Sequence, residues 1–95
     1  MKRLLLTLLA LMVAVVVNAA TVRGYVVDAE TGEALAAANV FIKGSSAGTT
    51  ADVRGYFEIN VADGTELTAA YVGYTPSSFT AESGNKAIEV RLQRS

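Results

Sequence analysis

The segment Tyr56–Tyr71, YFEINVADGTELTAAY, decides the fold class. Apolar and polar residues alternate through 56–61 and again through 66–71, which is the period of a β-strand with one buried face. Between the two runs lies Asp63-Gly64, a dipeptide typical of the tight turn of a β-hairpin. The segment therefore predicts two strands joined as a hairpin, each with one face towards a core.

The same period of two residues recurs on both sides of this segment. Further short strands are predicted at 21–28, 39–43, 77–81 and 86–92. A very short strand is also predicted at the end of the loop 44–50. The strand at 77–81 follows the only proline and is expected at a sheet edge, because proline donates no ladder hydrogen bond. About seven short strands, each with one wet face, predict an all-β, seven-stranded antiparallel sandwich.

The N-terminal twenty residues differ in composition from the rest of the chain. Two basic residues precede an apolar run at 4–17, and small residues follow at Ala19 and Ala20. This order predicts a helical signal peptide at 1–19, cleaved after Ala19 or alternatively after Ala20, and a single domain at 20–95. An uncleaved membrane anchor is the less favoured alternative, since the run is shorter than the ~20 residues of a spanning helix. We therefore expect no transmembrane segment in the mature protein.

Charge and composition narrow the classes of partner. Loss of two of the eight basic residues leaves six against nine acidic ones, a net charge of −3. No basic cluster remains, which argues against a nucleic-acid partner because grouped Lys and Arg bind phosphates. The chain has no cysteine, so it forms no disulfide and offers no thiolate to a metal.

Six motifs occur in a fixed order along the chain. They are V-x-G-x-V-x-D at 22–28, T-G-E-A-L at 31–35, A-N-V-F-I-K-G at 38–44, G-T-T-A-D-x-x-G-Y-F at 48–57, Y-V-G-Y at 71–74 and I-x-V-x-L at 88–92. This order resembles the carboxypeptidase regulatory-like domain. The resemblance implies a transthyretin-like sandwich in which the motif residues have structural roles: Gly24, Asp28, Gly44, Asp52, Gly55, Tyr71, Gly73 and Tyr74. Gly24, inside a strand, indicates a bulge or a close backbone approach.

The family that the chain resembles occurs in two settings. It follows the catalytic part of metallocarboxypeptidases, and it forms an N-terminal periplasmic extension of many TonB-dependent outer-membrane receptors. The sequence is closer to the second group, because the domain follows the predicted signal directly. The chain ends just past its last strand, so a stand-alone module, a fragment and a truncated receptor all remain open.

The residue types that catalysis needs are scarce. There is no histidine, whereas a zinc carboxypeptidase and the histidine-dependent transthyretin-like hydrolases require it. Ser83 and Lys86 have the spacing of a serine–lysine pair, but the intervening Gly84-Asn85 predicts a turn instead of a helix. Calcium ligation is disfavoured because no EF-hand loop surrounds the candidate carboxylates, which are Asp28, Glu30, Glu33, Asp52 and Asp63. We predict a protein without enzymatic activity, cofactor or metal.

Three aromatic residues are the candidates for a contact patch. By strand alternation Tyr25, Phe41 and Tyr56 point away from the core, and exposed aromatic side chains gathered together mark a contact surface. Tyr71 is expected to fill the core, and Tyr74 to pack across a sheet edge with its hydroxyl in water.

Two functions fit these patterns. The first is protein–protein docking or spacing at the cell envelope, with an envelope or outer-membrane protein as the partner, engaged in one version through an edge strand. The alternative is a secreted module that binds carbohydrate or a surface through the three outward aromatics. The protein is expected to be exported, and periplasmic, outer-membrane associated or secreted; its partner and oligomeric state stay open.

Overall fold

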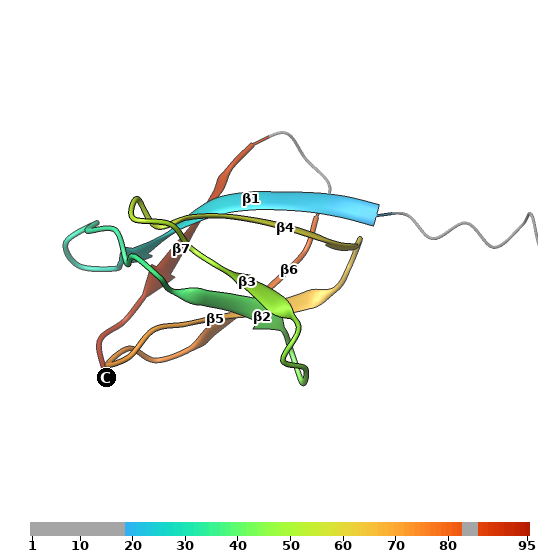
Figure 1. The fold of residues 1–95 in the computed structure, drawn as a ribbon. Helices are drawn as coiled ribbons and strands as arrows, with labels where there is room; N and C mark the ends of the chain where they lie inside the picture. The colour runs from blue at the N-terminus through green and yellow to red at the C-terminus, as the bar shows by residue number, and fades with distance from the viewer. Residues whose placement is uncertain (1–18, 83–85) are drawn as a thin grey trace, which may run out of the picture.

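The computed structural model describes residues 19–82 and 86–95, which form two packed β-sheets (Figure 1). The strands are β1 (Ala19–Asp28), β2 (Asn39–Ile42), β3 (Gly48–Thr50), β4 (Tyr56–Ala62), β5 (Glu66–Ala70), β6 (Ser77–Thr80) and β7 (Ile88–Leu92). The predicted helical signal peptide at 1–19 falls, apart from Ala19, on residues that lie outside this described part. Within the described part, no helix is long and apolar enough to span a membrane.

The predicted all-β sandwich of seven strands is confirmed. One sheet has three strands in the order β4-β1-β7, and the other has four in the order β3-β2-β5-β6. Every predicted strand is present, with bounds within two residues of those expected. The strand that follows Pro76 is β6, and it lies at the edge of its sheet as predicted.

One ladder departs from the antiparallel expectation, because β1 and β7 run parallel. Gly24 pairs with Ile88 at one end of this ladder, and Asp28 pairs with Leu92 at the other. The other ladders of the two sheets are antiparallel. The parallel pairing reflects how the last strand is connected, since β6 and β7 belong to different sheets and do not form a hairpin. The chain passes from the end of β6 to the other layer and starts β7 at the end of the sandwich where β1 also starts.

The hairpin predicted around Asp63-Gly64 is wrong. The turn is present, with Gly64 at φ 88°, a conformation that glycine adopts without strain. However, β4 and β5 lie in different sheets, so the turn carries the chain from one layer to the other. Its backbone bonds the end of β6 instead: Gly64 N–H donates to the Ala81 carbonyl, and Ala81 N–H to the Thr65 carbonyl, at 2.9 and 2.7 Å.

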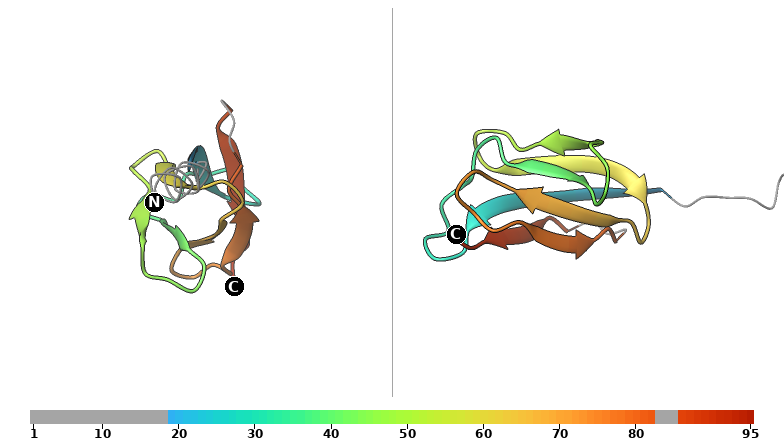
Figure 2. Two further views of the ribbon diagram at one scale, coloured as in Figure 1. Left: turned by 90° about the vertical axis from the view of Figure 1, so that its right-hand side faces the viewer. Right: turned by 90° about the horizontal axis from the view of Figure 1, so that it is seen from below.

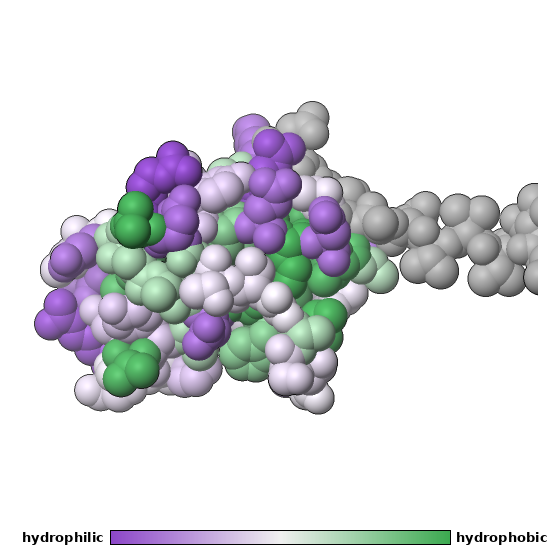
Figure 3. Space-filling view, viewed as in Figure 1, coloured by the Kyte–Doolittle hydropathy of each residue, from purple (hydrophilic) through white to green (hydrophobic). Residues whose placement is uncertain are grey.

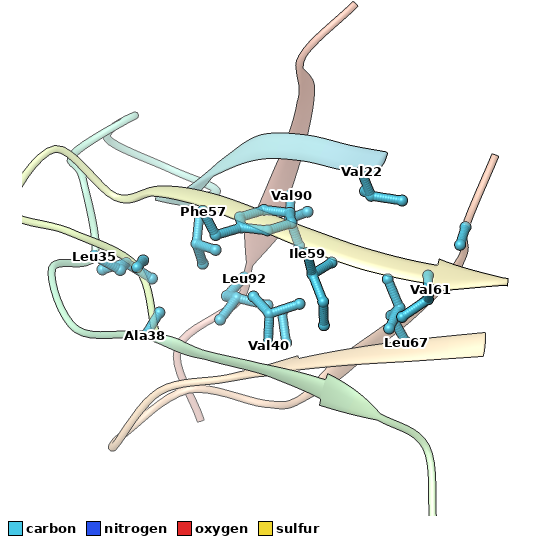
Figure 4. Packing of buried hydrophobic residues seen from close by; sticks show 14 residues of the cluster. Val22, Leu35, Ala38, Val40, Phe57, Ile59, Val61, Leu67, Val90 and Leu92 are labelled. Atoms are coloured by element: carbon cyan, nitrogen blue, oxygen red, sulfur yellow. The ribbon is translucent and has the colours of Figure 1, made fainter. Parts of the chain in front are cut away.

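The inward faces of the two sheets form one apolar core, as Figure 4 shows. The strict alternation of β4 buries Phe57, Ile59 and Val61 and leaves Glu58 and Asn60 exposed. The largest fully buried apolar side chains come from both layers: Phe57, Leu67, Leu92, Val26 and Val40.

Gly24 lies where two strands and an aromatic ring meet. A Cβ atom added there would stand 2.6 Å from the Ile88 carbonyl oxygen and 2.9 Å from the ring of Phe57. The ladders on both sides of Gly24 are continuous, so a close approach, and not a bulge, explains the glycine. The missing side chain leaves room for the Phe57 ring under β1 and β7.

We therefore expect Gly24→Ala to destabilise the domain by about 2 kcal/mol, because overpacking of a dense core forces its neighbours out of place. Thermal unfolding followed by circular dichroism should show a melting temperature lower by about 10 °C. Arg23→Ala, a change to the exposed side chain one residue earlier, is the control and should leave the melting temperature nearly unchanged. A melting temperature of Gly24→Ala equal to that of the control would contradict the close approach.

The two ends of the sandwich carry different connections. The connections at 29–38, 51–55 and 71–76 lie at the end where β1 and β7 finish, together with residues 93–95. The start of β1 lies at the opposite end, and the right-hand view of Figure 2 shows the C-terminus and the first residues of β1 on opposite sides. We call the end with the C-terminus the motif end.

Candidate functional site

Six of the eight residues to which the sequence motifs assign a structural role lie at the motif end of the sandwich. Asp28 is the last residue of β1, Asp52 and Gly55 lie in the turn before β4, and Tyr71–Tyr74 follows β5. Two motif glycines lie elsewhere: Gly24 is in the middle of β1, and Gly44, at φ 79°, is in the loop at the opposite end.

Asp28 is the centre of this cluster, and its side chain is only 1% exposed. Its Oδ1 accepts the backbone N–H groups of Glu30 and Thr31 at 2.8 and 3.0 Å. Its Oδ2 accepts the Tyr74 hydroxyl at 2.6 Å and Nε of Arg94 at 2.9 Å. We call Asp28, Tyr74 and Arg94 the interlock, because the three side chains tie together the end of β1, the turn after β5 and the C-terminal residues.

Hydrogen bonding keeps the Asp28 carboxylate ionised. The Tyr74 hydroxyl and then the Thr31 N–H lower the pKa of Asp28 far below its usual range, against the opposing effect of burial. The same contact with Asp28 raises the pKa of Tyr74 and that of Arg94. The expectation that the Tyr74 hydroxyl lies in water is therefore wrong, because this hydroxyl donates a hydrogen bond to the buried Asp28 carboxylate. Tyr71 is half-buried and packs against the core and against Tyr74, with ring centroids 5.5 Å apart.

The turn before β4 is built by a second aspartate. Oδ1 of Asp52 accepts the backbone N–H groups of Arg54 and Tyr56 at 2.8 and 3.0 Å. Gly55 has φ 75° and lies so close to β1 that an added Cβ would be 2.6 Å from the Val26 carbonyl oxygen. Asp52 and Gly55 thus fix the turn that presents Arg54 beside the first residue of β4.

The predicted aromatic patch is split between the two sheets. Tyr25 and Tyr56 are cross-strand partners on the outer face of the three-stranded sheet, with their rings 5.3 Å apart in an edge-on arrangement. The guanidinium of Arg54 lies 5.6 Å from the centroid of the Tyr56 ring. Tyr25, Tyr56 and Arg54 form what we call the tyrosine–arginine patch. Phe41 does not join it, because it lies on β2 in the other sheet.

Phe41 borders a shallow hollow of about 340 Å³ instead. The hollow is formed by the paired strands β2 and β3 and the loop between them, and we call it the β2–β3 hollow. Its lining residues are Asn39, Val40, Phe41, Ser45, Ser46, Gly48, Thr49 and Thr50.

The described residues offer no grouping suited to a metal. Among residues 19–82 and 86–95, no three His, Cys, Asp or Glu side chains lie close enough together to hold an ion. Ser83 of the serine–lysine spacing lies outside the described residues, and Lys86 is exposed.

Comparison with known families gives a match that spans nearly the whole described domain. The family model of the CarboxypepD_reg-like domain matches residues 22–95. The chain belongs to this family. The resemblance drawn from the motif order is thereby confirmed.

One curated relative of this CarboxypepD_reg-like domain is the TonB-dependent receptor SusC of Bacteroides thetaiotaomicron. It is 39% identical over 56 residues, which are 59% of this chain and 6% of the receptor. The chain thus corresponds to a small part of the length of that relative.

The sequence motifs of this CarboxypepD_reg-like domain do not specify Arg94 or Arg54. Arg94 lies beyond the last strand and meets an aspartate 66 residues earlier, and no local pattern predicts such a contact. The D-A-E-T-G order at 28–32 does contain a usable signal, because aspartate commonly accepts the backbone N–H two residues later. Asn39 and Thr50 lie within the motifs at 38–44 and 48–57, but polar residues on an exposed strand face are ordinary and do not by themselves indicate a site.

Proposed function

We propose that this CarboxypepD_reg-like domain is a non-enzymatic docking module of the cell envelope, which holds an envelope or outer-membrane protein through its tyrosine–arginine patch. The observation that carries the proposal is the contact of Tyr25, Tyr56 and Arg54 on one sheet face. Tyrosine and arginine are enriched among the residues that contribute most to protein interfaces. Both tyrosines lie on paired strands, so little conformational freedom is lost when a partner covers them.

The chemistry of the chain supports a role in contact and not in catalysis. It contains no histidine or cysteine, the residue types most often used as a general base or a thiol nucleophile. The most buried carboxylate, that of Asp28, is occupied by four hydrogen bonds and is not available as a base. Its function is to hold the fold together.

The expected location is the envelope of the cell. The predicted signal peptide at 1–19 directs export, and the similarity to a TonB-dependent receptor supports a place at or near the outer membrane. A docking module at the outer membrane would bring its partner to the polypeptide that contains or accompanies this domain.

Site-specific photo-crosslinking tests the proposal directly. p-Benzoyl-phenylalanine replaces Tyr25 in one variant and Phe41 in a control, since Tyr25 is exposed and Phe41 half-buried and the two aromatic positions lie on opposite sheets. After irradiation of intact cells, we expect one envelope protein to be crosslinked from position 25 and not from position 41. Arg54→Ala in the position-25 variant should reduce that adduct by about tenfold, as for loss of an interface hot spot. The absence of an adduct at position 25, or equal adducts at both positions, would contradict the patch as the docking surface.

A further inference from the structure

The β2–β3 hollow has the size and the setting of a small ligand site. Its volume of about 340 Å³ is near the lower end of the range for ligand-binding sites. It lies on the four-stranded sheet, away from the tyrosine–arginine patch on the other sheet. The tip of the loop between β2 and β3 projects at the lower right of Figure 3, where the face shown is pale.

Gly48 keeps the floor of the hollow bare. It is the cross-strand partner of Phe41, and a Cβ atom there would collide with the Val40 carbonyl oxygen and stand 2.7 Å from Cβ of Phe41. No side chain fits at this position, so the backbone of β3 stays uncovered beside the half-buried Phe41. An aromatic side chain therefore borders an open strand surface.

Most polar side chains of the hollow make no hydrogen bond to the described part of the protein. Across the described part of the chain, the side chains of Asn39, Ser46, Thr49 and Thr50 find no hydrogen-bond partner. The Ser45 hydroxyl accepts only the Ala47 N–H, at 3.1 Å. An amide supplies two donors and one acceptor oxygen, and each hydroxyl supplies one donor and two lone pairs. Several neutral donors and acceptors thus surround a small space.

The charge of the hollow limits what it can hold. None of the residues that line it is charged, so an anion would find no cation and a cation no carboxylate. Lys43, in the loop beside it, forms an ion pair with Glu66 at 3.1 Å. A suitable ligand is therefore neutral, and it carries both donors and acceptors next to an apolar face.

We propose that the β2–β3 hollow binds one or two units of a neutral saccharide. The apolar C–H face of a sugar ring lies against Phe41, and its hydroxyls bond Asn39, Thr50 and the serines of the loop. Sugar hydroxyls donate and accept at once, which matches the mixture of amide and hydroxyl groups. This site is independent of the docking proposal, because it uses the opposite sheet.

Titration of the ¹⁵N-labelled purified protein, followed by NMR, tests the site. The probes are cellohexaose, mannohexaose and maltohexaose, each added to about 20 mM, since a shallow open site predicts a Kd of about 1 mM. At least one hexasaccharide should shift the amide signals of residues 39–50 in a saturable way. No shift with any of the three would overturn the proposal, as would saturable shifts centred on Tyr25 and Tyr56.

Matched variants separate the hollow from the rest of the sheet. Asn39→Ala and Thr50→Val should each weaken binding by about fivefold, because each removes hydrogen bonds to the sugar. Thr80→Val, on an exposed position of β6 in the same sheet but outside the hollow, should bind as the unaltered protein does. Phe41→Ala should abolish binding, and the dispersion of its amide signals shows whether the fold is kept. Binding that is unchanged in Asn39→Ala and Thr50→Val would overturn the site even if Phe41→Ala unfolds.

Discussion

Replacement of Phe57 by alanine is expected to lower the melting temperature by about 20 °C. The side chain is 1% exposed and lies between the two sheets (Figure 4). The centroid of its ring is 6.2 Å from that of the Phe79 ring. Truncation of a buried phenylalanine costs about 4 kcal/mol, and a domain of this size has about 5 kcal/mol of stability in total. The chain has no cysteine, so no disulfide limits the loss. A considerable fraction of the variant should be unfolded at room temperature.

Thermal and urea unfolding followed by far-ultraviolet circular dichroism give the measurement. Val53→Ala is the control, because Val53 is 84% exposed in a turn and its truncation should change the melting temperature very little. If Phe57→Ala melted within a few degrees of Val53→Ala, the core would not be organised around the Phe57 ring.

The sequence predicted the strands well because alternation is a local property. Phe57, Ile59 and Val61 are buried as their spacing requires, and Glu58 is exposed. The pairing of strands was harder to predict. Asp63-Gly64 predicted a turn correctly, but a turn does not determine whether the next strand joins the same sheet or the opposite one. That choice depends on β2, which pairs with β5 through contacts distant in sequence.

The candidate sites show the same division between local and distant information. Alternation correctly placed Tyr25 and Tyr56 on an outer face, yet it could not tell that Phe41 belongs to the other layer. The hydrogen bonds from the backbone to Asp28 follow a local turn pattern. The bonds from Tyr74 and Arg94 do not, because these residues approach only when both sheets are assembled.

The interlock makes a second strong prediction: Asp28→Asn should lower the melting temperature at neutral pH by about 10 °C. An amide has one acceptor oxygen where the carboxylate has two. Asparagine can therefore keep the backbone bonds or the bonds from Tyr74 and Arg94, but not both sets. Whichever oxygen is lost, its place is taken by an NH₂ group that faces other donors at a position only 1% exposed. Tyr74→Phe, which removes one donor and leaves the carboxylate, should have a smaller effect.

The dependence on pH distinguishes this ionic role from simple packing. The pKa of Asp28 is lower in the folded state than its ordinary value, so the unfolded chain takes up the proton first as the pH falls. The stabilisation is complete above about pH 5 and is lost progressively below it. Melting temperatures measured from about pH 7 down to pH 2 should therefore converge for the unaltered protein and Asp28→Asn. Glu30→Gln, at an exposed neighbour of Asp28, should run parallel to the unaltered protein. A constant difference between Asp28→Asn and the unaltered protein over the whole range would mean that the shape of Asp28, and not its charge, holds the C-terminal residues in place.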